Sequence, residues 1–118
     1  MSPTDAELAA LSVHELTVRV SAAAGDVLVA ANELLANAPV NAPDRAVALS
    51  LFYVVLEPRS QIRRRADYVK DMTLESTGHL RYEARAILSD APWQSKVGAM
   101  VDFVEELDRI MEKARSDR

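Results

Sequence analysis

Apolar residues recur at intervals of three and four along most of the chain, which is the spacing of one face of an α-helix. The clearest stripe lies between Val13 and about Asn37, and a second one lies in the last long segment, Pro92 to about Ala114. The first stripe consists of Leu16, Val20, Ala23, Val27, Ala31 (or Ala30), Leu34 and Ala38. The second consists of Val97, Met100 (with Val101), Val104, Leu107 and Met111, widened by Phe103 and Ile110. Strand-like alternation is absent over any long window, so the pattern predicts an all-α protein.

Capping residues predict where the first helices begin. Ser2-Pro3-Thr4 is typical of a helix start, and a short helix is expected from Pro3 to Leu11. Ser12 and Glu15 have the spacing of a capping box, in which each side chain accepts a hydrogen bond from the other residue's backbone amide. The sequence leaves open whether the helices on the two sides of Ser12 are continuous. Asn41 is expected to cap the helix that follows, which would begin at Pro43.

The segment from Pro43 to Glu57 is apolar nearly all round, and such a helix is expected at the centre of a bundle. If the other helices do not surround it, the same pattern predicts an oligomer contact. Pro58 is expected to end or kink this helix. A third long segment, with Gly78 near its end as a C-terminal cap, is predicted from Arg59 to about Leu74. A short helix is expected around His79 to Ser89.

These elements predict one domain over residues 1–118, a compact bundle of four main helices plus one or two short helices, with residues 115–118 frayed. The 118 residues are 49% hydrophobic and 27% charged, as in ordinary globular proteins. The longest strongly apolar run without a charge, residues 46–56, is shorter than the about 20 residues that a membrane span needs. We therefore expect no membrane partner. The absence of cysteine and of a signal-peptide pattern at Met1 favours a cytoplasmic location.

Charge is distributed unevenly in a chain whose net charge is −4. Residues 1–57 carry −5, residues 58–85 carry +3 and residues 86–118 carry −2. The positive charge is concentrated in one predicted helix, at Arg59, Arg63, Arg64, Arg65 and Lys70. Such long cationic side chains could contact phosphates of a nucleic acid or another anion. The alternative is an ordinary solvated or partner-facing helix, because Asp67 and Asp71 partly cancel the cluster.

Small residues interrupt the first long stripe at Ala22, Ala23, Ala24 and Gly25. Small side chains allow a second helix to approach closely, so we predict a close helix contact there, within one chain or across a dimer. Trp93, the only tryptophan, is predicted to be a core anchor or an interface residue.

No arrangement of nucleophile, base and orienting group is evident. The two histidines, His14 and His79, lie at predicted helix starts, and the chain has no cysteine. The acidic row Asp67, Asp71 and Glu75 lacks a convincing second row to complete a metal site. The sequence therefore predicts no enzyme activity, no metal and no cofactor.

The function predicted first is that of a small, non-enzymatic helical protein that binds another protein, as an accessory or regulatory factor. A homodimer through the first or last long helix is its natural form. The alternative is a nucleic-acid-binding regulator that uses the helix from Arg59 to Lys70. The excess of 11 arginines over 3 lysines favours a high-GC bacterial or phage genome.

Overall fold

The computed structural model describes residues 2–39, 43–72, 74 and 78–116, and all its regular elements are α-helices. They are α1 (Asp5–Ala9), α2 (Val13–Asn37), α3 (Arg45–Val69), α4 (Gly78–Ile87) and α5 (Trp93–Ser116). The predicted all-α bundle is confirmed. In the described residues, every helix is too short or too polar to span a bilayer.

The predicted start of α2 is confirmed, and it separates α1 from α2. Ser12 has extended backbone angles, its Oγ accepts from Glu15 N at 3.1 Å, and Glu15 Oε1 accepts from Ser12 N at 3.3 Å. This is the expected capping box. α1 begins later than predicted, because Thr4 rather than Ser2 is its N-cap.

Pro58 does not end a helix, so of the two outcomes predicted for it, an end or a kink, the end was wrong. α3 continues through Pro58 for 25 residues. Pro58 is buried, and so are Val55 and Ile62 on the turns before and after it. Burial on both sides of the proline outweighs the loss of one backbone hydrogen bond.

Three predicted helix ends also differ from the structure. α3 begins at Arg45 after Asp44 rather than at Pro43, and the expected cap Asn41 lies outside the described residues. Gly78 begins α4 instead of capping the helix before it. Arg115 and Ser116 belong to α5 and are not frayed.

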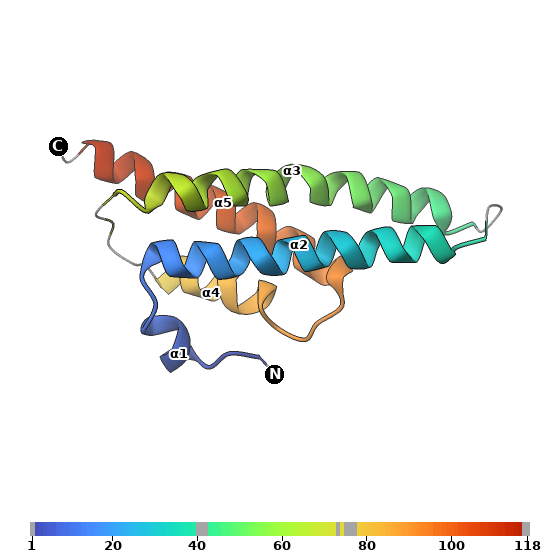
Figure 1. Cartoon of the computed structure of the whole chain (residues 1–118), viewed down its shortest axis with the longest axis horizontal. Coiled ribbons are helices and arrows are strands. Elements are labelled where there is room, and N and C mark those ends of the chain that lie inside the picture. Colours follow the sequence, from blue (N-terminus) through green and yellow to red (C-terminus); the bar gives the residue numbers. More distant parts are fainter. Residues whose placement is uncertain (1, 40–42, 73, 75–77, 117–118) are drawn as a thin grey trace.

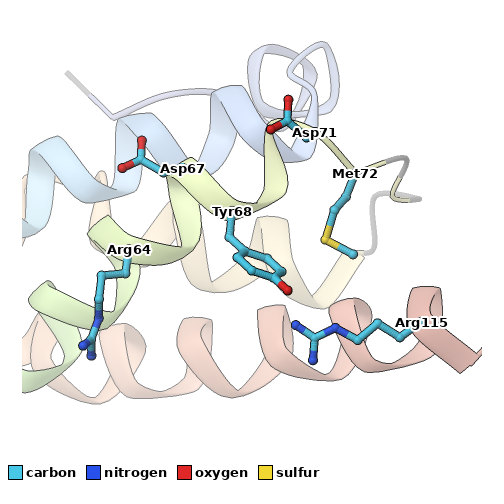
Figure 2. A pocket seen from close by; sticks show the side chains of 6 residues that line it. All are labelled: Arg64, Asp67, Tyr68, Asp71, Met72 and Arg115. Carbon is cyan, nitrogen blue, oxygen red and sulfur yellow. The ribbon is translucent and has the colours of Figure 1, made fainter.

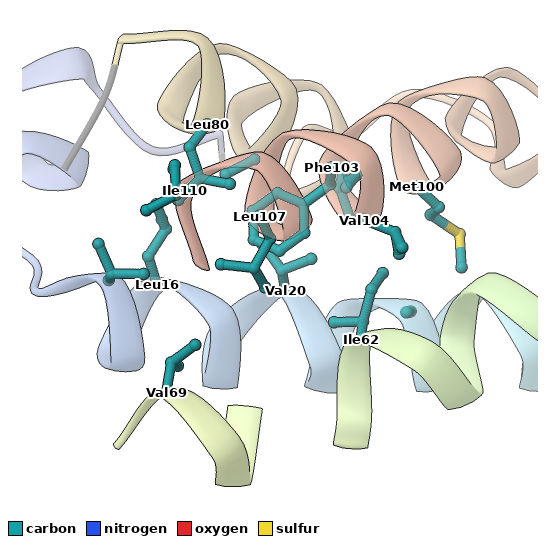
Figure 3. Packing of buried hydrophobic residues seen from close by; sticks show 14 of the residues in the cluster. Leu16, Val20, Ile62, Val69, Leu80, Met100, Phe103, Val104, Leu107 and Ile110 are labelled. Atoms are coloured by element: carbon teal, nitrogen blue, oxygen red, sulfur yellow. The ribbon is translucent and has the colours of Figure 1, made fainter. Parts of the chain in front are cut away.

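The hydrophobic core lies at one end of the molecule, where one face of each helix is buried. Figure 3 shows its centre, where Leu16 and Val20 of α2, Ile62 of α3 and Phe103 and Leu107 of α5 converge. Leu8 of α1 and Leu80 of α4 are also buried, whereas Trp93 is half-buried against the core.

The other end of the molecule consists of α2 and α3 alone. The Cα atoms extend over 55 × 29 × 18 Å, and α2 and α3 run side by side along the long dimension (Figure 1). Trp93, where α5 begins, lines a hollow together with Ala30 of α2. We call residues 31–37 of α2 and 45–54 of α3, which lie beyond this point, the α2–α3 arm (Figure 1).

Candidate interaction surfaces

One face of α2 runs from the core onto the α2–α3 arm. Val13, Val20, Val27 and Leu34 lie seven residues apart and therefore on one side of the helix. The first three are at most 5% exposed, whereas Leu34 is 43% exposed. The apolar stripe is thus longer than the bundle that covers it.

The same holds for the side of α3 that faces α5. Arg65 lies on that side, because its guanidinium pairs with Asp108 of α5. Val54, eleven residues or three turns earlier, lies on the same side and is 49% exposed. Val47, two turns earlier again, is 62% exposed. Both valines precede the point where α5 begins.

The opposite side of the arm also presents apolar side chains. Leu49 is 42% exposed and Tyr53 is 64% exposed. The prediction that the segment from Pro43 to Glu57 is a central, surrounded helix was therefore wrong. Of its described residues only Val55 is fully buried. The sequence pattern shows that a helix is apolar, but it does not show whether other helices of the same chain bury its side chains.

Arg45 joins the two helices of the arm. Its Nη1 donates to the carbonyl oxygen of Leu35 at 2.9 Å and to that of Ala38 at 3.3 Å. These carbonyls lie at the C-terminal end of α2, where backbone acceptors have no intrahelical donor. The arginine thereby directs its positive charge at its own chain.

The predicted basic cluster does not form one continuous patch. Arg65 binds both oxygens of Asp108, with Nε–Oδ1 at 2.6 Å and Nη2–Oδ2 at 3.0 Å. Arg59 is half-buried, whereas Arg63, Arg64 and Lys70 are exposed. Because helical positions are 100° apart, Arg63 and Lys70 point to one side of α3, Arg64 to the outside and Arg65 to α5.

Arg64 borders a hollow of about 470 Å³ between α3 and α5. Figure 2 shows the ring of Tyr68 between the side chains of Arg64 and Arg115. The guanidinium carbon of Arg115 lies 5.3 Å from the centroid of that ring, a cation–π distance. Asp67 and Asp71 line the same hollow, so its rim carries both signs of charge.

The small residues of α2 do not share one environment. Ala24 is fully buried and Ala23 packs against the core, whereas Ala22 is exposed. A Cβ atom built on Gly25 would meet no atom within 4 Å. Among the described residues no other helix approaches Gly25 closely, and a contact there with a second copy stays a prediction.

The two histidines lie in different environments. His14 hydrogen-bonds through Nδ1 to the carbonyl oxygen of Ala66, 2.9 Å away, and so joins α2 to α3. His79 lines a different hollow together with Glu83, Asp102 and Glu106. Burial, and secondarily the nearby Asp102 and Glu106 carboxylates, raise the pKa of Glu83 despite the neighbouring His79. Within the described part of the chain no three His, Cys, Asp or Glu residues are grouped as a metal site would need.

Sequence reasoning missed the tertiary roles of His14, Arg45 and Arg65. Their hydrogen-bond partners lie 52, 10 and 43 residues away, so no local spacing could indicate them. The exposed end of the α2 stripe had a signal in the sequence. Apolar residues repeat every seven positions from Val13 to Leu34, which is a longer stretch of α2 than the other helices cover. Comparison of the chain with protein-family models, curated proteins and solved structures finds no match.

Proposed function

We propose that this is a non-enzymatic protein that acts by binding another protein through the apolar surface of the α2–α3 arm. The observation that carries the proposal is the continuation of the core-facing stripes of α2 and α3 beyond the start of α5. Leu34, Val47 and Val54 are 43 to 62% exposed. Farther along the same sides, Val20 and Val27 of α2 are buried and Arg65 of α3 is half-buried against α5. Exposed apolar side chains that share one side of a protein are typical of interaction sites.

The chemistry of the arm supports a protein partner. No charged residue occurs between Ala46 and Leu56, and Arg45 is directed at α2. A helix in a partner could cover Leu34 and Val47 as α5 covers the same faces in the bundle. A nucleic acid, whose backbone is charged, has little to contact here.

The basic residues support the second candidate, a nucleic-acid-binding regulator. Arg63, Arg64 and Lys70 are exposed on the half of α3 that lies away from the arm. Arg65 is held by Asp108, so fewer cations are available than the sequence count suggests. The two candidates thus assign binding to opposite ends of α3.

The experiment that separates them is affinity capture from lysate of the native host, with and without nuclease, followed by quantification of protein and nucleic acid. We expect a partner protein that survives nuclease and is lost at least about tenfold with Leu34→Glu or Val47→Glu. Tyr82→Glu, which also replaces an exposed apolar residue, is the matched control and retains the partner. Binding of nucleic acid alone, abolished by Arg63→Glu with Arg64→Glu, favours the second candidate.

A further inference from the structure

We infer that two copies of this protein associate through the outer face of α3, with the two α3 helices antiparallel about the midpoint between Ser60 and Gln61. This surface is separate from the arm stripe of Leu34 and Val47. It differs from the homodimer predicted through the first or last long helix, but part of it lies in the segment from Pro43 to Glu57, for which the sequence predicted an oligomer contact if other helices do not surround it. The inference adds a self-association surface to the proposed function and does not require it.

The outer face of α3 is a continuous row opposite the buried side of the helix. Tyr53, Glu57, Ser60, Arg64 and Tyr68 follow one another at intervals of four, three, four and four. The glutamate, the arginine and both tyrosines are exposed, and Ser60 is half-buried. Tyr53, Glu57 and Arg64 are exposed along this row, and within the described residues only its last member, Tyr68, contacts another helix, through Arg115 of α5.

The order of side chains in this row is self-complementary. In an antiparallel pair of identical helices, residues equally far from the midpoint face each other. Glu57 and Arg64 are equally far from the midpoint between Ser60 and Gln61, and so are Tyr53 and Tyr68. Two-fold pairing therefore places each glutamate opposite an arginine and each Tyr53 opposite a Tyr68, twice over. An isologous interface needs this kind of matching.

Local contacts hold these side chains in place before association. Glu57 Oε1 accepts from Gln61 Nε2 at 3.0 Å. The Tyr53 ring packs edge-on against Phe52, with ring centroids 5.9 Å apart. Tyr68 is held under Arg115 at the edge of the hollow shown in Figure 2. In the antiparallel pairing, Tyr53 of the second copy meets this hollow, where an aromatic ring and two guanidinium groups offer stacking and cation–π contacts.

The size of the contact predicts a weak dimer. The face from Tyr53 to Tyr68 covers roughly 24 Å of helix at 1.5 Å per residue. One helix face of this length is at the low end for specific interfaces, so we expect dissociation in the micromolar range. The charge pairs are exposed and are screened by salt.

The test is sedimentation equilibrium of the purified chain at about 20 mM and about 500 mM salt, with charge-swapped variants. Glu57→Arg and Arg64→Glu each turn two attractive pairs into two repulsive ones, and we expect each to weaken the homodimer about tenfold. Mixing the two variants restores opposite charges at both positions, so the mixture is expected to form a heterodimer. Leu34→Glu changes the apolar stripe of α2 and lies outside the outer face of α3, so it leaves the dimer intact, and this proposal and the proposed function can fail separately.

Cross-linking tests the register independently of charge. The chain has no cysteine, so Ser60→Cys introduces a single thiol beside the two-fold axis. We expect this variant to form a disulfide-linked dimer under mild oxidation, and the exposed control Ser95→Cys to stay monomeric. A chain that stays monomeric up to about 1 mM, or a dimer unaffected by either charge swap, overturns the inference. The inference is also overturned if Arg64→Glu abolishes nucleic-acid binding but leaves the mass measured by sedimentation equilibrium unchanged.

Discussion

At the scale of single residues, three half-buried polar side chains each join two helices. His14 bonds α2 to α3, Arg45 bonds the start of α3 to the end of α2, and Arg65 bonds α3 to α5. Each is half-buried and reaches a partner on another helix. Hydrogen bonds that involve a charged group contribute more to stability than neutral ones. These contacts fix how the helices are placed relative to one another.

The fold disfavours the ionised form of the Glu83 side chain. Because its pKa is raised, the folded chain holds the Glu83 proton more tightly than the unfolded chain does. The free energy of unfolding therefore falls as the pH rises from the ordinary value of 4.5 through the higher folded pKa. We expect Glu83→Gln to raise the melting temperature at pH 7, and the gain to shrink toward zero below pH 4.5. Thermal denaturation followed by circular dichroism at both pH values measures this, and an equal gain at both contradicts it.

At the scale of elements, the sequence predicts what is determined locally. The capping box of Ser12 and Glu15 spans four residues, so its pattern was sufficient to place the start of α2. Pro58 was misinterpreted because the burial that keeps α3 continuous comes from other helices. The exposure of Val47 could not be predicted either, since a stripe does not reveal where a covering helix begins. Local signals thus gave the helical character of the chain and the cap of α2, whereas the candidate surfaces needed the tertiary arrangement.

The start of α2 gives a prediction at this scale. The hydrogen bonds of Ser12, from its side chain first and its backbone second, lower the pKa of Glu15. A lowered pKa contributes stability that is present above pH 4.5 and is lost as the pH falls through the folded value. We expect Ser12→Ala to cost about 1 kcal/mol of unfolding free energy at pH 7 and less at pH 3. Urea denaturation measures both.

Ser95→Ala is the matched control for this measurement. Its Oγ donates only to Pro92 O in the first turn of α5, at 2.8 Å. We expect a smaller loss, about equal at the two pH values. If Ser12→Ala costs no more than Ser95→Ala, the capping box does not stabilise the start of α2.

At the scale of the whole molecule, the two ends differ in how many helices pack together. All five helices contribute to the core at one end, whereas the α2–α3 arm is a two-helix hairpin (Figure 1). In the arm, Ala31 and Leu35 of α2 are buried, but neither belongs to the hydrophobic cluster that contains Phe103. Local stability follows the number of buried contacts, so the arm is expected to open more readily than the core. A partner that covers Leu34 and Val47 would stabilise it, which couples binding to the order of the arm.

Hydrogen exchange measured by mass spectrometry tests this difference. We expect backbone amides of residues 31–37 and 48–54 to exchange faster than those of 16–27 and 59–69, although all belong to the same two helices. Arg45→Met removes the bonds to Leu35 O and Ala38 O, and we expect exchange in 31–37 to rise about tenfold or more. Arg85→Met removes the exposed pair with Asp5 at the other end and leaves exchange in the arm unchanged. Equal protection along α2 in the unsubstituted chain contradicts a weakly held arm, because the free energy of local opening is then uniform along the helix.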